Sequence, residues 1–240
     1  MSSTSKPDDR FQLTPDIDTV LELLYDAYGK PAPEPEDDIL ATLVATILSQ
    51  STNNANSDRA FGDLVDRFQG DWQQVQDADV DEVADAIAIG GLSNQKAPRI
   101  QAILEKVYED FGEHSLEDLR TWEVKKAERY LRSMKGVGPK TAAFVLMRAA
   151  QMPLFAMDTH ILRLARRLGW ISPTLSDTKA HEALLPHIPE GDHDPAHVAM
   201  IWHGRRTCHA RSPACESCAL LSLCVHGQKK ISATDTDTDE

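Results

Sequence analysis

Long apolar runs are missing from this sequence of 240 residues. The longest, around Leu40–Leu48 and Ala142–Met147, are far shorter than the roughly 20 residues that a helix needs to cross a bilayer. Residues 1–10 are polar and include no hydrophobic segment of the signal-peptide type. These absences argue against a membrane protein, and we expect the protein to be cytoplasmic.

Strand patterns are also missing, because Val, Ile and Thr never alternate with polar residues over a length that indicates a sheet. Apolar residues recur instead at helical spacing in Ile17–Leu24, Val80–Ile87 and Ile103–Val107, and Ile39–Gln50 is almost entirely apolar. The sequence therefore predicts an all-α protein. The proline-rich Lys30–Glu36 predicts a linker, and the Thr-Asp repeats near the C-terminus predict a disordered acidic tail.

Positive charge is scarce: 25 Lys and Arg face 38 Asp and Glu, for a net charge of −13. An acidic, Lys-poor surface suits a high-salt cytoplasm, and we expect a halophilic source. The charge is unevenly distributed, since residues 1–39 carry a net −7 and residues 136–176 a net +4. The second segment could form a basic face for nucleic acid, or Arg163, Arg166 and Arg167 could be the solvated side of a helix.

Cysteine is absent except for Cys208-x6-Cys215-x2-Cys218-x5-Cys224. Disulfides would need an oxidising compartment, to which the sequence shows no route. Structural zinc more often takes two C-x2-C pairs, whereas four-cysteine ligation of an iron–sulfur cluster fits this spacing at least as well. The residues favour a cluster, and zinc stays open.

Gly136-Val-Gly-Pro-Lys-Thr-Ala142 predicts a tight turn followed by a helix with Pro139 at its first position. Backbone N–H groups at such a helix start bind phosphate, but the segment could also be an ordinary corner between helices. Lys140 falls in the first helical turn, where the dipole favours a neutral amine, the nucleophile of Schiff-base chemistry. The alternative is a surface lysine paired with phosphate.

Asp158 predicts the N-cap of a helix that ends at Gly169, and its carboxylate could also tune Lys140. Gln50 leads into a run of small polar side chains that could contact DNA or form a solvated loop. Asp194 and Pro195 predict the start of another helix. Seven of the nine histidines lie in residues 181–226 without metal-ligand spacing, and we interpret them as surface residues.

Taken together and in this order, these segments resemble the endonuclease III family of helix-hairpin-helix DNA glycosylases. The resemblance covers roughly residues 39–226 and makes the cluster the expected metal centre. It rests on five segments: Ile47-Leu-Ser-Gln50, Gly91-Leu-Ser-Asn-Gln-Lys-Ala97, Met134-Lys-Gly-Val-Gly-Pro-Lys-Thr-Ala142, Met157-Asp-Thr-His160, and His203-Gly-Arg-Arg-Thr-Cys208 leading into the other cysteines.

The resemblance implies a bifunctional DNA glycosylase/AP lyase of base excision repair that removes damaged bases. We expect these bases to be oxidised pyrimidines. Lys140 would form the Schiff base with C1′ of the sugar, and Asp158 would activate it. Other residues would contact double-stranded DNA that carries a damaged base or an abasic site. Gln50 would fill the gap that the extruded base leaves in the stack, and Leu92 would enter the opposite strand as a wedge. A phosphate would be bound by Gly136, Val137 and Gly138, and the rest of the DNA backbone by His160, Arg205, Arg206 and Arg211.

The resemblance also implies a 4Fe–4S cluster on Cys208, Cys215, Cys218 and Cys224, and a monovalent cation at the hairpin. It implies a nucleoid-associated monomer with two helical lobes. Residues 1–38 would be a tail, a helix and the linker, with the helix packed on the C-terminal lobe. Residues 39–152 would form the helical barrel lobe with the hairpin, residues 153–226 the C-terminal lobe with the cluster loop, and residues 227–240 a disordered acidic tail.

The sequence departs from the family pattern at three positions. Asn53 stands where Asp is frequent, Pro139 where a basic residue is common, and Lys135 where proline is common. These changes weaken inferences about the preferred base but leave Lys140 and Asp158 in place. Lys140 argues against a purely monofunctional adenine-mismatch glycosylase. The rival functions are a non-catalytic helix-hairpin-helix DNA-binding protein and a redox-sensing iron–sulfur protein.

Overall fold

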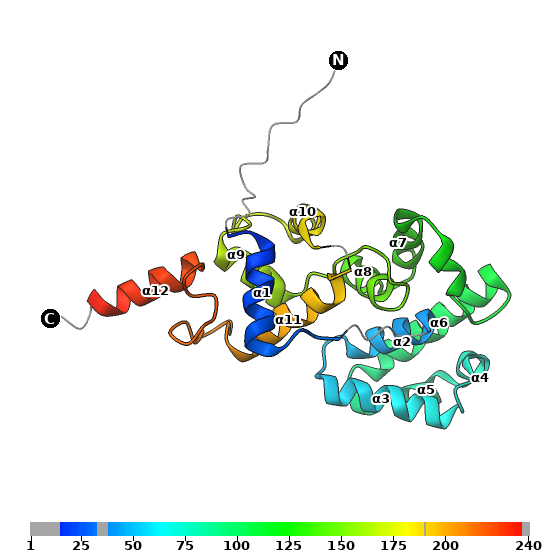
Figure 1. Ribbon diagram of the computed structural model, residues 1–240. Helices are drawn as coiled ribbons and strands as arrows, with labels where there is room; N and C mark the ends of the chain where they lie inside the picture. The colour runs from blue at the N-terminus through cyan, green and yellow to red at the C-terminus, as the bar shows by residue number, and fades with distance from the viewer. Residues whose placement is uncertain (1–14, 33–37, 190, 237–240) are drawn as a thin grey trace, which may run out of the picture. The chain divides into compact units, whose positions relative to one another are not determined.

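The computed structural model describes residues 15–32, 38–189 and 191–236 of the chain (Figure 1). Within these ranges the regular structure consists of α-helices and short 3-10 turns without a strand, which confirms the all-α prediction. Among the same residues no helix is long and apolar enough to cross a membrane. The chain divides into two compact units, residues 34–154 and residues 1–33 with 155–240.

The unit of residues 34–154 is built around one buried helix, α2. Its Ile, Leu and Val side chains are fully buried because it packs against α3, α6 and α8. The helices of this unit are α2 (Ile39–Ser49), α3 (Asn54–Arg67), α4 (Trp72–Asp77), α5 (Val80–Ala86), η1 (Ala88–Gly90), α6 (Ser93–Phe111), η2 (Glu117–Thr121), α7 (Val124–Arg132) and α8 (Pro139–Arg148).

The other unit joins the N-terminal helix to the C-terminal part of the chain. Helix α1 packs against α11, and α9 packs against both α11 and α12. The hydroxyl of Tyr25 and the ammonium group of Lys30 both reach the carboxylate of Asp192, at 3.1 Å and 2.6 Å. The helices are α1 (Ile17–Tyr28), α9 (Thr159–Leu168), α10 (Asp177–Leu184), η3 (Leu185–His187), α11 (His193–Arg206) and α12 (Val225–Thr236).

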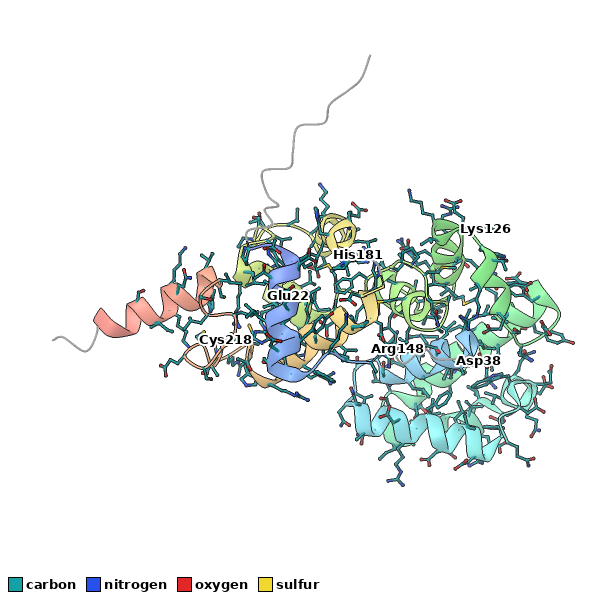
Figure 2. The ribbon with its side chains drawn as sticks, in the orientation of Figure 1. Glu22, Asp38, Lys126, Arg148, His181 and Cys218 are labelled. Carbon is teal, nitrogen blue, oxygen red and sulfur yellow. The ribbon has the colours of Figure 1, made fainter. Side chains whose placement is uncertain are left out.

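Aspartate side chains begin many of these helices, which accounts for part of the excess of Asp over Glu. A short carboxylate at the N-cap accepts hydrogen bonds from the free N–H groups of the first turn, as Asp38 does at the start of α2 (Figure 2). Hydrogen bonds to their carboxylates hold the pKa of Asp16 and Asp71 below the usual value. The N-cap aspartates whose side chains accept these bonds are Asp16, Asp38, Asp71, Asp79 and Asp158.

Two sequence predictions need correction here. Helix α11 begins at His193, with Asp192 and not Asp194 at the N-cap. The Asp192 side chain is bound by Tyr25 and Lys30 instead of the helix, and the missing N–H of Pro195 falls in the first turn, where it is tolerated.

The second correction concerns the tail, which is helical in residues 227–236 because its first turn packs on the cysteine loop. The Gly227 N–H donates to Sγ of Cys224 at 3.4 Å, and the Gln228 amide donates to the Ser222 carbonyl at 2.6 Å. Residues 237–240 and residues 33–37 of the predicted linker lie outside the described residues.

Candidate functional site

The turn between α7 and α8 has the tight geometry that its two glycines predict. Gly136 adopts a positive φ of 88°, whereas Gly138 at φ −86° is the N-cap of α8 and needs no special freedom. Val137 between them is buried and anchors the turn. No side chain among the described residues caps α8, so the N–H groups of its first turn are available to bind an anion.

Lys140 lies in the first turn of α8, directly after Pro139 at the first helical position, as predicted. Its side chain is exposed, and within the described part of the chain no carboxylate forms an ion pair with it. An exposed amine beside uncapped backbone N–H groups can meet a bound phosphate and an adjacent sugar together. Its role as a nucleophile stays a prediction.

The Gln50 side chain is brought onto this same turn. Its Nε2 donates to the Gly136 carbonyl at 3.2 Å and lies 3.4 Å from the Thr141 hydroxyl. Nη1 of Arg99 donates to Oε1 of Gln50 at 3.0 Å. The sequence does not reveal this role of Arg99, because its position on an amphipathic helix looks the same whether the side chain binds a neighbour or faces solvent.

Asn53 does not extend the polar loop after Gln50, because it begins a helix. Its side chain accepts from the Asn56 N–H at 2.9 Å and so caps α3, which starts at Asn54. The free loop is thus limited to residues 50–53.

Lys96 is buried at 2% exposure and ties the end of α2 to the turn before α6. Its ammonium group donates to the carbonyls of Leu48 at 2.6 Å and Gly90 at 2.9 Å. Burial, and secondly the charge of Arg99, lowers the pKa of Lys96. In the sequence Lys96 is part of the Gly91–Ala97 segment, whose pattern indicates no role for its side chain.

Leu92 stands at the start of α6 in a left-handed conformation with φ 52°. Its side chain is 49% exposed. The Leu92 carbonyl accepts from the Lys96 N–H at 2.9 Å in the first turn of α6, and the Lys96 ammonium group holds the turn before Leu92 through the Gly90 carbonyl. The geometry is compatible with a wedge, which stays a prediction.

Asp158 belongs to the unit with residues 155–240 and caps α9, as predicted. Its Oδ1 accepts from the N–H groups of His160 and Ile161, each at 2.9 Å, and α9 ends at Gly169. The carboxylate is 8% exposed, so only a narrow part of it meets solvent. Its other predicted role, toward Lys140 of the unit 34–154, is not tested by these contacts.

His160 is held on α9 by its neighbours. Nη2 of Arg163 lies 2.9 Å from its Nδ1 and donates to the Gly204 carbonyl at the same distance. A Cβ at Gly204 would come within 2.6 Å of Cβ of His160, so this glycine allows α11 to approach the ring. Arg163 also donates to the Cys208 carbonyl at 2.9 Å, which connects His160 with the cysteine loop.

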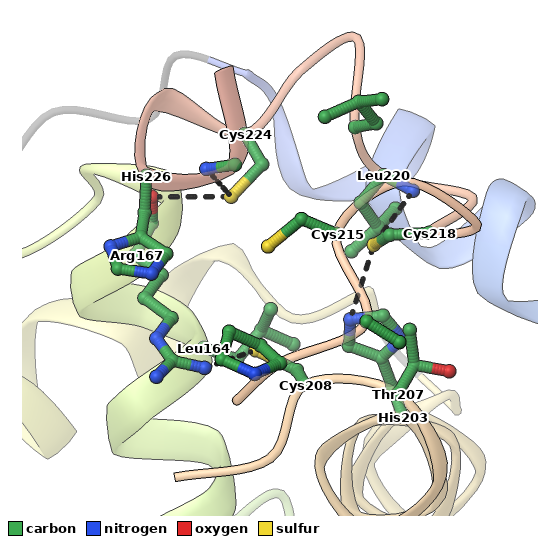
Figure 3. A pocket seen from close by; sticks show the side chains of 14 residues that line it. Leu164, Arg167, His203, Thr207, Cys208, Cys215, Cys218, Leu220, Cys224 and His226 are labelled. Carbon is green, nitrogen blue, oxygen red and sulfur yellow. Dashed lines mark hydrogen bonds between the residues drawn. The ribbon is translucent and has the colours of Figure 1, made fainter. Parts of the chain in front are cut away.

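The four cysteines line one pocket, although they are spread over an irregular loop that ends at Cys224, directly before α12 (Figure 3). The structure contains no disulfide between them. Several donors point at their sulfurs: Nη1 of Arg167 at 3.0 Å from Cys208, and backbone N–H groups of Leu220 and Gly227 at 3.4 Å from Cys218 and Cys224.

No group of three or more His, Cys, Asp or Glu side chains in the described ranges could hold a metal ion as it stands. Burial raises the pKa of the Cys218 and Cys224 thiols. Thiols in such a place become good ligands only when a bound metal deprotonates them. Four reduced cysteines, three of them with N–H donors at their sulfurs, therefore share one pocket.

Two histidines correct the prediction of a solvated set. His197 is 4% exposed and its Nδ1 lies 2.7 Å from the Ala156 carbonyl, while His203 is 1% exposed. Nδ1 of His203 lies 2.9 Å from the Tyr28 hydroxyl and its Nε2 3.8 Å from Sγ of Cys218. Burial, with a smaller contribution from Arg163, lowers the pKa of His203 to about 4, so the ring is neutral near pH 7.

The arginines beside the cysteines are exposed, as a surface for phosphates requires. The Arg206 guanidinium stacks 4.9 Å from the Trp202 ring centroid and 5.6 Å from that of Tyr28. This stacking holds it in place without pairing its charge. Arg205 and Arg211 are exposed on either side of Cys208, and contact of the three with DNA stays a prediction.

Comparison with known proteins identifies the family. Residues 44–190 match the model of the HhH-GPD superfamily base excision DNA repair protein. The chain is 32% identical over 194 residues to endonuclease III of Thermotoga maritima, a match that covers 81% of the chain and 86% of the relative. It is 36% identical over 170 residues to an Arabidopsis thaliana protein named as a DNA glycosylase, covering 71% of the chain but only 58% of that relative.

Solved structures agree with these sequence matches. A non-covalent endonuclease III–DNA complex superposes with a TM-score of 0.75 at 28% identity, covering 90% of this chain and 97% of that one. A trapped endonuclease III–DNA covalent intermediate has a TM-score of 0.74 at the same identity and coverage. The chain therefore belongs to the HhH-GPD superfamily of base excision DNA repair proteins, within the endonuclease III family of DNA glycosylases/AP lyases.

Proposed function

We propose that this protein removes damaged bases, oxidised pyrimidines in particular, from double-stranded DNA through a Schiff base on Lys140. The observation that carries the proposal is an exposed lysine in the first turn of α8, beside N–H groups that no side chain of the described residues caps. The trapped covalent DNA complex of a structural relative supports a covalent route. Because its substrate would be chromosomal DNA, we expect the protein at the nucleoid.

The hairpin would bind the backbone of the duplex. The backbone of Gly136, Val137 and Gly138 would lie against a phosphate at the positive end of the α8 dipole. The N–H groups of Gly136 and Gly138 would be the donors, since the Val137 N–H already donates to the Met134 carbonyl at 3.1 Å. Carbonyls of the same turn could bind a monovalent cation that bridges to the phosphate. These contacts would place the sugar of the damaged nucleotide near Lys140.

Lys140 would then attack C1′ of that sugar as a neutral amine. The C1′–N bond breaks, the base leaves with its electron pair and takes up a proton, and loss of the amine proton with ring opening gives an iminium ion. Removal of a C2′ proton then breaks the C3′–O bond and nicks the strand. Water releases the lysine from the remaining imine. Asp158 would accept the proton from the amine or stabilise the positive charge that develops on the sugar.

Extrusion of the base would depend on residues at the ends of helices. Gln50 would fill the gap left in the stack, and Leu92 would enter the opposite strand as a wedge. His160, Arg205, Arg206 and Arg211 would contact phosphates. The exposure of Leu92 and of the arginines supports these roles, since a buried side chain could not reach DNA.

Cys208, Cys215, Cys218 and Cys224 would hold a 4Fe–4S cluster. The cysteine spacing favours a cluster over the two C-x2-C pairs that structural zinc more often takes. N–H donors at three of the sulfurs would stabilise thiolate ligands. The cluster would fix the loop that carries Arg211.

Visible absorbance with iron and sulfide analysis tests the cluster. We expect brown protein with about four irons per chain, and replacement of Cys215 by Ser should lower the iron content. One zinc per chain and colourless protein would refute the cluster.

Borohydride trapping tests the function. The wild type and Lys140→Ala would be mixed with duplexes that carry an abasic site or thymine glycol, and binding would be measured in parallel. We expect a covalent adduct with the wild type only, while Lys140→Ala still binds. An adduct of equal yield in Lys140→Ala would remove that lysine as nucleophile. DNA binding with neither adduct nor base release would favour the non-catalytic DNA-binding alternative.

A further inference from the structure

Arg99 of α6 lies against the hairpin turn. A Cβ added to Gly136 would meet Cδ, Nε and Cζ of Arg99 within 2.3, 2.4 and 2.7 Å. The stem and guanidinium of Arg99 therefore cover the face of Gly136 that any other residue would fill. Arg99 can lie this close to the turn only because residue 136 is glycine and has no Cβ.

The same guanidinium determines how the Gln50 amide is turned. A guanidinium only donates, so the amide atom that faces Nη1 of Arg99 at 3.0 Å is the oxygen. Nε2 then faces the Gly136 carbonyl at 3.2 Å and the Thr141 hydroxyl at 3.4 Å, which both accept. If Arg99 were absent, these two contacts alone would restrain the amide within the described part of the chain.

The charge of Arg99 has no carboxylate partner among the described residues, although its side chain is half-buried. Lys96 lies close enough for the charge of Arg99 to help lower its pKa. A half-buried cation beside a second cation costs free energy that an apolar side chain would not. Packing alone therefore does not account for a guanidinium at this position.

We propose that Arg99 is a positioning residue that holds Gln50 on the hairpin turn and orients its amide for entry into the base stack. One hydrogen-bonded unit then contains the turn that binds phosphate and the side chain that fills the gap. Docking of the turn on DNA would place Gln50 opposite the unpaired base at the same time. This inference rests on the proposed role of Gln50.

The test compares variants at positions 50, 67 and 99 on duplexes with one abasic site. Arg99→Met keeps an unbranched stem over Gly136 but loses the donor, and Arg99→Lys keeps a cation. Arg67→Met is the control, because it removes one cation of the same unit that pairs with Glu82 far from the turn in sequence. Trapping rates would be measured together with the fluorescence of 2-aminopurine opposite a tetrahydrofuran abasic analogue.

We expect Arg99→Met to lower the trapping rate about 5-fold to 20-fold, since a hydrogen bond to a charged group is worth on the order of 10-fold or more. We expect the 2-aminopurine signal to fall both in Arg99→Met and in Gln50→Ala. Arg99→Lys should recover part of both signals, and Arg67→Met should change neither. An equal loss in Arg67→Met would overturn the proposal, because general charge would then explain the effect.

The double variant Gln50→Ala with Arg99→Met decides whether Arg99 acts through Gln50. We expect it to trap at the rate of Gln50→Ala alone, whereas multiplied losses would show an independent role and refute the inference. Unfolding by urea would be measured for each variant to separate misfolding from mispositioning. Absence of trapping in the wild type would contradict the proposed function itself, a result distinct from either outcome for Arg99.

Discussion

The ammonium group of Lys96 donates a 2.6 Å hydrogen bond to the carbonyl oxygen of Leu48, which lies 48 residues earlier in the chain. The Leu48 carbonyl is one of the last in α2, where no further intrahelical N–H is present. A second bond, to the Gly90 carbonyl, ties in the turn that presents Leu92. One buried cation thus replaces missing helix bonds and positions a residue that we propose contacts DNA.

Replacing Lys96 by Met should therefore destabilise the fold. Met fills similar space, but two buried carbonyls lose their donor, and we expect a loss of about 2–4 kcal/mol in the free energy of unfolding. Lys106→Met is the matched control, because it removes an exposed ion pair with Asp110 and should cost about 0–1 kcal/mol. Urea unfolding measures both, and equal losses would contradict the capping role of Lys96.

Gly136→Ala should be more harmful than the same change at Gly112. Both glycines have positive φ, 88° and 75°, but a Cβ at Gly112 meets nothing within 4 Å, whereas at Gly136 it overlaps Arg99. We expect about 1 kcal/mol for the backbone strain at either site and at least about 1 kcal/mol more at Gly136. Thermal unfolding of both variants compares them.

The steric part of this loss can be checked separately. Adding Arg99→Ala to Gly136→Ala should restore stability, because the overlap disappears with the arginine side chain. A double variant less stable than Gly136→Ala would show that contact with Arg99 is not the cause.

Two substitutions can separate the helix-capping role of Asp158 from its proposed catalytic role. Asparagine caps a helix as well as aspartate does, so Asp158→Asn should unfold at the wild-type midpoint but trap DNA on the order of 100-fold more slowly. Asp158→Ala should lose the same activity and also about 1 kcal/mol of stability. If Asp158→Asn trapped at the wild-type rate, the carboxylate would be a cap only.

Tyr130 should make stability fall at alkaline pH. Its hydroxyl donates to Oδ2 of Asp110 at 2.8 Å, and burial, with a smaller effect from the hydrogen bond and charge of this carboxylate, raises the pKa of Tyr130 above its usual value. A raised pKa means that the folded state keeps the proton more tightly. Its stabilising contribution is then complete below about pH 10 and is lost as pH rises toward the folded pKa.

Urea unfolding at pH 9 and pH 11 measures this effect. Tyr130→Phe should lose less stability between the two values than the wild type, because the ionising hydroxyl is gone. Tyr108→Phe is the control at an exposed ring and should retain the wild-type slope. An unchanged slope in Tyr130→Phe would refute the assignment.

Features of this protein that depend only on residues close together in the sequence are determined by the sequence alone. The helical spacing, the cap at Asp158, the turn at Gly136 and the first helical position of Pro139 all lie where the sequence predicts them. Each is set by hydrogen bonds or backbone angles within three or four residues, which a local pattern records. The ordered motifs with the cysteine spacing also predicted the family.

Only the tertiary structure decided which side chains meet across the chain. Arg99 and Gln50 are 49 residues apart, and His203 and Tyr28 are 175 residues apart. Sequence patterns gave Arg99 no role and placed His203 at the surface, because burial depends on which helices pack together. The N-cap of α11 at Asp192 also involves distant residues, since Tyr25 and Lys30 bind its side chain. Local chemistry thus determined the elements, and packing determined the partners of each functional side chain.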